Sequence, residues 1–521
     1  MTIARGRTQV ASLATAILVG LGGLVLALPT LASGPTPDVS AIDARVRAFM
    51  ESSGVPGAAY GLVQDGTIVH LAAQGVAGPD GRAMSPQTPL VIGSVGKSIT
   101  ALAIRQLVEA GRIDPSAPVT RYLPLFALAG PDGAAADVTI RSLVSHTSGL
   151  STADGQDPRW YEPGLTPEEV VRGIASVRAD RPAGTFEYSN LNFVVLGVVI
   201  ETVTHQAYGD YLRDRVFRPL AMTHSQASPD LGSIVGLGQG HRFLFGQAVP
   251  FDEPFPSGMI AAGYQVSTAE DLAHFVGALA NGGVYDGVDV VAPGRDPSTD
   301  RAYGTDWRDL VAVGAGTSIG QSGSTLATNA DILESPSDRL GVVVLLDANP
   351  TQLAPAAGAA DLALDLLRLS SGGPVLAGAP SVRSVYLVVD AALLLLVALF
   401  VVHLARVRTW PARLGQASHR RRFLTRSVVA DGVLPLAVLI GVPLLIGSTG
   451  SSQAGDVASG WAFAIWTLPD LAWTGLLLAF GGLAVGCYKL LAMRQTDRPA
   501  ATLPLQFVRH WPGPPGSGRY G

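Results

Sequence analysis

Three long apolar runs near the end of the chain limit its architecture more than any other feature. They cover residues 385–405, 428–447 and 468–488, and each is long enough to cross the roughly 30 Å hydrocarbon core of a bilayer as one helix. Residues 33–384 contain no comparable run. The sequence therefore predicts a folded domain that stays in water, followed by three transmembrane helices.

Charges between these runs orient the helices. The connector 406–427 carries seven arginines and no acidic residue, whereas the connector 448–467 carries Asp456 and no Lys or Arg. The tail 489–521 is basic again. Because basic connectors remain on the cytoplasmic side, we expect 406–427 and the tail in the cytoplasm. The preceding domain then lies outside the cytoplasmic membrane, with lipid around the three helices.

The N-terminus has the features of an export signal. Arg5 and Arg7 precede an apolar stretch over 11–28, and small residues at 30 and 32 mark a cleavage point before Ser33. An uncleaved anchor is the alternative, because the apolar stretch is long for a signal peptide. We therefore expect a signal peptide at 1–32, a linker at 33–40, the folded domain at 41–370, a second linker at 371–384 and membrane helices over 385–488.

Three carboxylates lie within or beside the predicted spans: Asp390, Asp431 and Asp470. An intramembrane carboxylate is a candidate for function. All three are near span ends, where water and headgroups are within reach, so we interpret them as structural.

Composition excludes several classes of function. The net charge of −5 averages an acidic part at 33–383 and a basic part at 384–521, so no overall basic charge is available for nucleic acid. The single cysteine, Cys487, excludes a disulfide framework and a cysteine-based zinc site. The histidines show no H-E-x-x-H pattern, and no glycine-rich phosphate loop is present. We expect neither a metal nor a cofactor.

Periodicity within 41–370 indicates an α+β domain. Strand patterns at 57–63 and 67–73 flank an Asp65-Gly66 turn, and two more, at 327–333 and 340–347, come late in the domain. Helical patterns occupy 43–50, 94–110, 139–144, 167–177, 190–203 and 268–280. Because strands stand at both ends and helices between them, we expect the two ends to share one sheet.

The strongest chemical signal is Ser94-Val95-Gly96-Lys97 at the start of a predicted helix. An i, i+3 spacing places the lysine amine on the same face as the serine hydroxyl, which needs a base to become a nucleophile. Burial would lower the lysine pKa and supply the neutral amine. Lys97 is the only lysine before residue 489. Since arginine cannot act as a base, this retained lysine indicates a need for deprotonation.

Two further motifs follow. In Tyr188-Ser189-Asn190 a phenol can relay a proton and a carboxamide can bind a substrate, although the same residues suit a helix cap. In Gln321-Ser322-Gly323-Ser324 the glycine lets backbone approach a ligand closely.

Two other patterns are set aside. Residues 316–320 match G-x-S-x-G, but that motif needs a helix directly after the serine and a downstream acid and histidine. The next histidine is His403, inside the first predicted span. We interpret His146, within Ser145-His146-Thr147-Ser148-Gly149, as a hydrogen-bonded turn residue rather than a catalytic group.

In this order and spacing the three motifs resemble those of the serine β-lactamase and penicillin-binding-protein superfamily, in its branch of class C β-lactamase-related serine hydrolases. The resemblance covers most of the domain. Besides the motifs it includes residues 91–98, 111–114, 122–124, 143–150, 263–268 and 341–344. It implies a β-lactamase/transpeptidase-like fold, with a mixed sheet flanked by helices, an all-helical lobe and the active site between them.

The resemblance also implies roles for the motif residues. Ser94 would form an acyl-enzyme, with Lys97 and Tyr188 sharing the work of the general base. Asn190 would bind substrate and orient Lys97. The backbone N–H groups of Ser94 and Ser324 would form the oxyanion hole.

The chain departs from the family at Gln321, where the family usually has Lys or His. A neutral amide gives no charge-assisted contact to a substrate carboxylate. We therefore expect a membrane-tethered serine hydrolase that acts on an ester, an amide or a cell-wall-peptide-like substrate, with residues 321–324 contacting it. The alternatives are a D-Ala-D-Ala carboxypeptidase or β-lactamase proper, a binding or sensor protein that is acylated without turnover, and a structural partner of wall machinery.

Overall fold

The computed structural model describes most of the chain, in two units. The described residues are 37–130, 132–134, 136–179, 184–280, 284–285, 288–289, 295–296, 301–302, 308–313, 316–352, 357–375, 381–416, 420–446, 461, 464–465 and 468–496. The expected signal peptide, much of the connector 448–467 and the tail from 497 lie outside them. Contacts divide the chain into Met1–Tyr386 and Leu387–Gly521.

The first unit is built on a six-stranded sheet in the order β11-β12-β13-β14-β1-β2. Its strands are β1 (Gly57–Gln64), β2 (Thr67–Gly75), β11 (Arg308–Val313), β12 (Gly316–Ser324), β13 (Asn329–Ser335) and β14 (Leu340–Leu346). Because β14 pairs with β1, strands from the two ends of the domain share one sheet, and that prediction is confirmed.

Every pairing in this sheet is antiparallel, whereas a mixed sheet was expected. All neighbours except β14 and β1 are consecutive strands, and no crossover connection makes a parallel pair. The predicted turn between β1 and β2 is confirmed. Asp65 and Gly66 both have positive φ, 51° and 74°, as a two-residue type I′ turn requires.

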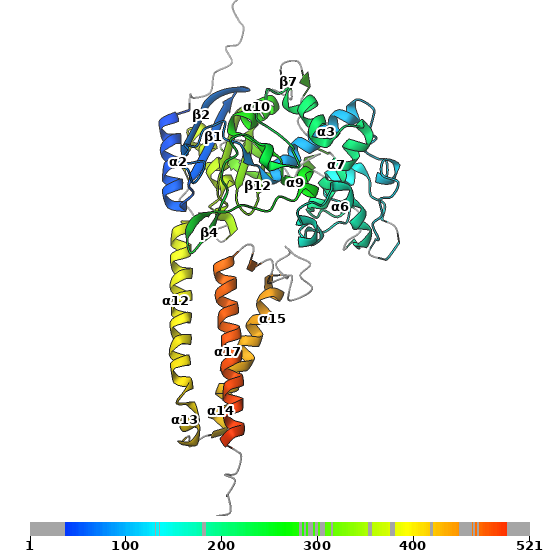
Figure 1. The fold of residues 1–521 in the computed structure, drawn as a ribbon. Coiled ribbons are helices and arrows are strands. Elements are labelled where there is room, and N and C mark those ends of the chain that lie inside the picture. Colours follow the sequence, from blue (N-terminus) through cyan, green and yellow to red (C-terminus); the bar gives the residue numbers. More distant parts are fainter. Residues whose placement is uncertain are drawn as a thin grey trace, which may run out of the picture. The chain divides into compact units, whose positions relative to one another are not determined.

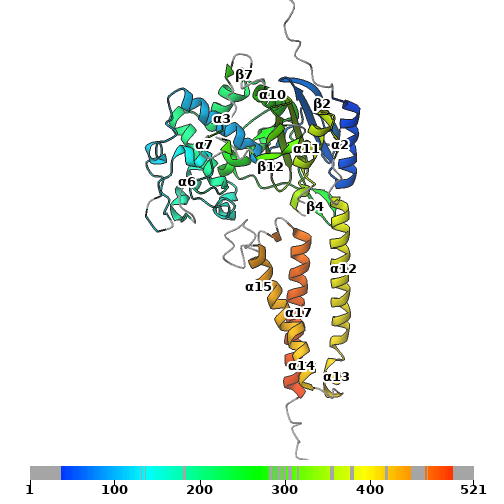
Figure 2. The ribbon, with the colours of Figure 1, turned by 180° about the vertical axis from the view of Figure 1, so that it is seen from behind.

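Alternate residues of a strand point to opposite sides of the sheet, so apolar side chains are present on both faces. Helices cover both of these faces. One face packs on α2 (Val39–Ser53) and α11 (Ala359–Ser370), and the other on α10 (Ala269–Ala280). The first face carries Ala58, Tyr60, Leu62, Val342, Val344 and Leu346, and the second carries Ala59, Val63, Val343 and Leu345. Figures 1 and 2 show these layers from opposite sides.

A helical lobe is inserted between β2 and β11 and surrounds α7 (Asn190–Thr204) (Figure 1). Its other helices are α3 (Gly96–Glu109), α4 (Ile140–Val144), α5 (Thr152–Gly155), α6 (Pro167–Gly173), α8 (Tyr208–Leu212) and α9 (Ile260–Gly263). Residues 191–200 of α7 are all buried, which explains why this helix reads as continuously apolar. The predicted fold, an α+β domain with a helical lobe, is confirmed.

Short strands complete the unit. They pair as β3 (Leu90–Val91) with β6 (Val266–Ser267), β4 (His241–Leu244) with β5 (Gln247–Pro250), β7 (Val284–Tyr285) with β8 (Val288–Asp289), and β9 (Arg295–Asp296) with β10 (Arg301–Ala302).

The second unit is helical. Its elements are most of α12 (Val382–Val407), α13 (Trp410–Gln416), α14 (Arg420–Val428), the π-helical turn η9 (Val429–Val433), α15 (Leu434–Ile446) and α17 (Pro469–Thr496). Three helical stretches are long and apolar enough to cross a membrane: Val382–Val407, Leu424–Gly441 and Pro469–Met493. The three predicted candidate spans are therefore confirmed as helices.

Asp431 connects these candidate spans. Its carboxylate contacts His403 Nε2 of α12 at 2.6 Å and accepts a hydrogen bond from Lys489 Nζ of α17 at 2.5 Å. Asp431 and Lys489 are buried within the helices. We call these three residues the Asp431 cluster. Its contacts agree with a structural role for this carboxylate.

Candidate active site

Ser94 and Lys97 lie at the junction of a short 3₁₀ turn, η1 (Gly93–Val95), with α3. Lys97 is fully buried. Its Nζ donates to Ser94 Oγ at 2.9 Å and to the backbone oxygen of Ala262 in α9. The i, i+3 spacing therefore places the amine beside the hydroxyl.

Tyr188 reaches the same hydroxyl from the segment before α7. Its Oη shares a hydrogen bond of 2.7 Å with Ser94 Oγ, and its ring centroid lies 4.9 Å from Lys97 Nζ. Two groups that can exchange a proton thus contact one candidate nucleophile.

The third motif lies on β12, which packs directly against η1. A Cβ on Gly93 would lie 2.4 Å from the Ser324 nitrogen, and one on Gly323 would lie 2.9 Å from the Ser94 nitrogen. Gly93 also has a positive φ of 55°. Glycine at both positions is what allows the backbone amides of Ser94 and Ser324 to come close together.

The polar side chains of the third motif point in different directions. Ser322 Oγ donates to Asp331 Oδ2 at 2.6 Å, and Ser324 Oγ accepts from Asn329 Nδ2 at 2.8 Å. Gln321 is buried, and its Nε2 donates to the Ser322 carbonyl at 2.9 Å. Among the described residues, Gln321 Oε1 has no hydrogen-bond partner.

Asn190 is held by residues that the sequence analysis did not single out. Its Nδ2 donates to Tyr161 Oη at 2.7 Å and lies 3.4 Å from the Gly155 oxygen. Its Oδ1 has no partner in the described part of the chain. The amide oxygen therefore accepts no hydrogen bond from Lys97, although the resemblance implied that Asn190 orients this lysine. The Lys97 amine donates instead to Ala262 O, a backbone contact that no side-chain motif reveals.

A half-buried group of polar side chains lies beyond Tyr161. The Tyr161 and Tyr264 rings meet edge to face with centroids 6.3 Å apart, and Tyr264 Oη donates to Glu253 Oε1 at 3.2 Å. Burial raises the pKa of Tyr161 to about 12 and also raises the pKa of Glu253. Tyr264 lies in the matched stretch 263–268, which was the one available signal for this group.

His146 packs against the ring of Tyr188. It occupies a turn after α4 with a φ of 55°, and its ring stacks on the Tyr188 ring with centroids 4.6 Å apart. Burial and, to a smaller extent, the Lys97 charge lower the pKa of His146 to about 3. The predicted turn is confirmed, and the imidazole is neutral near pH 7.

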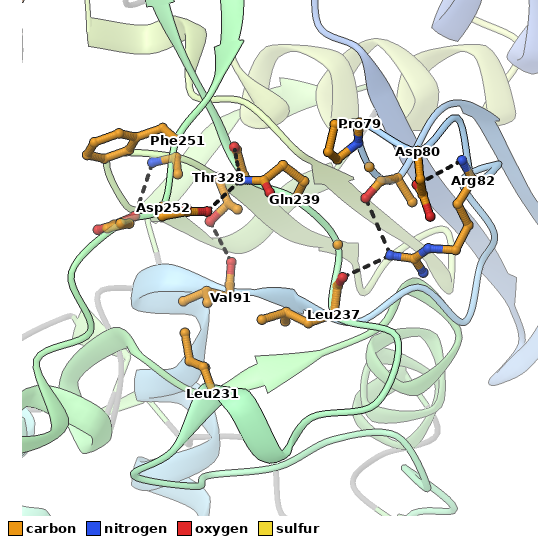
Figure 3. A pocket seen from close by; sticks show the side chains of 16 residues that line it. Pro79, Asp80, Arg82, Val91, Leu231, Leu237, Gln239, Phe251, Asp252 and Thr328 are labelled. Atoms are coloured by element: carbon orange, nitrogen blue, oxygen red, sulfur yellow. Dashed lines mark hydrogen bonds between the residues drawn. The ribbon is translucent and has the colours of Figure 1, made fainter.

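A separate cavity of about 520 Å³ lies beside the β12–β13 turn. Figure 3 shows its polar rim, where Arg82 donates to the Leu237 carbonyl at 2.9 Å and Gln239 Nε2 donates to Asp252 at 3.2 Å. None of the candidate site residues lines it.

The geometry agrees with the comparison to known families. The β-lactamase family profile matches residues 42–366, well over half of the chain. The chain belongs to the β-lactamase family. The resemblance found in the three motifs is thereby confirmed at the level of family and fold.

Individual relatives of this β-lactamase-family chain are moderately similar to it in sequence. It is 29% identical over 202 residues to the putative penicillin-binding protein PbpX of Bacillus subtilis, which is 39% of this chain and 49% of that protein. The chain thus spans about half the length of the curated relatives it matches.

Two solved structures are similar to this β-lactamase-family fold. The octameric penicillin-binding protein homologue from Pyrococcus abyssi has a TM-score of 0.55 at 25% identity, over 66% of this chain and 79% of that one. EstCE1, a hydrolase with promiscuous acyltransferase activity, has a TM-score of 0.54 over 63% of this chain and 99% of that one. At 19% identity, that likeness concerns the fold alone.

Proposed function

We propose that this chain is a membrane-anchored serine hydrolase that works through an acyl-enzyme on Ser94. The observation that carries the proposal is the double contact of Ser94 Oγ, with Lys97 Nζ at 2.9 Å and Tyr188 Oη at 2.7 Å. A serine hydroxyl becomes nucleophilic when a neighbouring base accepts its proton. Here two such groups are already within hydrogen-bond distance.

Acylation follows from this arrangement. Ser94 Oγ attacks the substrate carbonyl carbon while its proton passes to the Lys97–Tyr188 pair. The negative charge on the carbonyl oxygen is stabilised by the adjacent N–H groups of Ser94 and Ser324, where one such donor is worth about 3 kcal/mol. The bond to the leaving group then breaks, and the pair returns the proton to that group. An acyl ester on Ser94 remains.

In deacylation, water is the nucleophile and Ser94 is the leaving group. A water molecule gives a proton to the Lys97–Tyr188 pair through the phenol and attacks the acyl carbon. The Ser94–acyl bond breaks, and Ser94 Oγ regains the proton. Asn190 would contact the acyl substrate near this centre, since its Oδ1 is unpaired in the described structure.

The neutral side chain of Gln321 limits the class of substrate that we expect. With a neutral amide at this position, a substrate carboxylate gains no charge-assisted hydrogen bond from the third motif. This favours an ester, amide or peptide that carries no carboxylate near the scissile bond. A D-Ala-D-Ala peptide or a β-lactam would be a slower substrate.

The charge pattern supports a location. Three candidate spans, with arginines in the connector 406–427 and acid in 448–467, fit anchoring in the cytoplasmic membrane with the catalytic domain outside. A cell-wall peptide or a small acyl compound is accessible there.

The test uses the full chain in detergent. A panel of p-nitrophenyl esters, a D-Ala-D-Ala peptide and a fluorescent penicillin is offered to wild type, Ser94→Ala and the matched control Ser98→Ala. Ser98 lies one turn further along α3, and its hydroxyl has no hydrogen-bond partner among the described residues. We expect ester turnover that Ser94→Ala reduces by at least about 10³-fold and Ser98→Ala leaves within about twofold.

The other outcomes would contradict the proposal. Stable penicillin labelling of Ser94 without turnover of any substrate would indicate a binding or sensor protein. Equal turnover by wild type and Ser94→Ala would show that the catalytic assignment is wrong.

A further inference from the structure

One buried histidine, His146, contacts Tyr188 and both of its neighbours in the chain. His146 is 1% exposed, and it is separated from Tyr188 by more than forty residues of sequence, including α5, α6 and their connections. The hydrogen bonds of its carbonyl and imidazole, and its ring stack, are made with Tyr188 and with residues next to Tyr188 in the fold.

His146 holds the backbone on both sides of Tyr188. The Glu187 N–H donates to the His146 carbonyl oxygen at 2.7 Å. The Ser189 N–H donates to His146 Nδ1 at 3.1 Å. The N–H groups of the residues before and after the tyrosine are therefore bound to a single residue, which restricts the position of the Tyr188 Cα and the direction of its side chain.

The imidazole also restrains the phenol itself. The rings of His146 and Tyr188 are stacked, with an interplanar angle of 28° and centroids 4.6 Å apart. Lys97 also lies over the Tyr188 ring, with its Nζ 4.9 Å from the ring centroid. Rotation of the phenol away from Ser94 Oγ would break the stack.

The hydrogen bonds determine the form of the imidazole. A backbone N–H can only donate, so Nδ1 is the bare nitrogen and Nε2 carries the hydrogen. Asn192 Nδ2 donates to the same Nδ1 at 3.0 Å, and Ser148 Oγ orients that amide through its Oδ1 at 2.6 Å. The lone pair on Nδ1 is thus occupied, and the buried ring is neutral.

We propose that His146 is a positioning residue that fixes the Tyr188 phenol against Ser94, an inference that rests on the proposed function. Three requirements meet at this position: a backbone with positive φ, a neutral hydrogen-bond acceptor and a flat ring. Asparagine satisfies the first two, because it tolerates positive φ and its carboxamide oxygen accepts. Phenylalanine satisfies the third alone.

A double-mutant cycle tests the inference. We compare kcat and KM for one p-nitrophenyl ester in the full-length wild type, His146→Phe, His146→Asn, Tyr188→Phe and the two double variants. We expect His146→Phe to lower kcat about 100-fold with KM within about threefold, and His146→Asn to recover about tenfold of that loss. In the Tyr188→Phe background, either change should lower kcat by less than about threefold, because the group that His146 positions is gone.

The control variant is His205→Phe, and two outcomes would contradict the inference. His205→Phe alters another histidine with positive φ, 58°, at the exposed end of α7, and kcat should not change. If His146→Phe does not fold, His146→Asn in both backgrounds decides the question. Equal factors in the two backgrounds would overturn the positioning role while Ser94-dependent turnover remains. Turnover that does not depend on Ser94 would overturn the proposed function and this inference together.

Discussion

At the scale of single residues, Gln321 occupies the motif position where the resemblance leads us to expect Lys or His. Its amide lies on β12 two residues before Gly323, and its Oε1 is buried without a partner among the described residues. A lysine at this position would offer a substrate carboxylate an ionic hydrogen bond. Such a bond contributes about 1.5–3 kcal/mol.

We therefore expect Gln321→Lys to increase kcat/KM for a D-Ala-D-Ala peptide, or the acylation rate by penicillin, by about 10- to 100-fold. Turnover of an ester without a carboxylate should stay within about threefold. Stopped-flow acylation and steady-state hydrolysis measure both values, with Gln321→Met as the uncharged control. An equal gain for both kinds of substrate would show that charge at residue 321 does not select the substrate.

The residues of the site differ in how far sequence could predict them. Ser94, Lys97 and Tyr188 were found because each belongs to a short motif whose spacing has a chemical meaning. Ala262 could not be found, because it acts through its backbone oxygen and any residue there would supply one. Tyr161 binds Asn190 across 29 residues of sequence, and no local pattern records such a contact.

At the scale of elements, the Asp431 cluster links three candidate spans through one buried carboxylate. Lys489 loses its carboxylate partner in Asp431→Asn, and an uncompensated buried charge costs about 3–5 kcal/mol. Replacing both partners, as in Asp431→Asn with Lys489→Met, removes the unpaired charge. We expect the single variant to be destabilised by this amount and the double variant to recover most of it.

Unfolding of the full chain in micelles, followed by fluorescence of Trp410 beside Lys489, measures this difference. Asp390→Asn is the matched control, because Asp390 Oδ1 has no hydrogen-bond partner in the described residues. Its effect should stay below about 0.5 kcal/mol. A double variant as unstable as the single one would show that the cluster does not hold the helices.

Element types were largely predictable, and element ends less so. The strands at 57–63 and 67–73 were placed correctly because the Asp65-Gly66 turn is encoded locally. The helix expected at 43–50 extends over Val39–Ser53, since the Asp38 carboxylate caps it by accepting from the Ser40 and Ala41 N–H groups. The antiparallel sheet could not be predicted, because pairing between distant strands depends on the tertiary fold.

At the scale of the whole molecule, one buried acid makes the stability of the first unit depend on pH. Glu334 on β13 is 8% exposed, and burial raises its pKa to about 7 from a usual value of 4.5. A carboxyl group whose pKa is raised by folding stabilises the fold fully below pH 4.5. That contribution is lost as the pH rises through 7.

Glu334→Gln should therefore match wild type in melting temperature near pH 4.5 and become more stable as the pH rises. The gain should level off above pH 7 at about 3 kcal/mol. Thermal unfolding from pH 4 to 8.5 measures this, with the exposed Glu162→Gln as control. A difference that is constant with pH would contradict the assignment.

The central claim is that Ser94 carries the acyl group during turnover. Its most direct test is to mix the full chain with a p-nitrophenyl ester, quench in acid within seconds, and locate the added mass by peptide mass spectrometry. The account predicts one acyl group per chain, on the peptide that contains Ser94. The group should be absent in Ser94→Ala. An acyl group on another residue, or turnover with Ser94 unmodified, would contradict it.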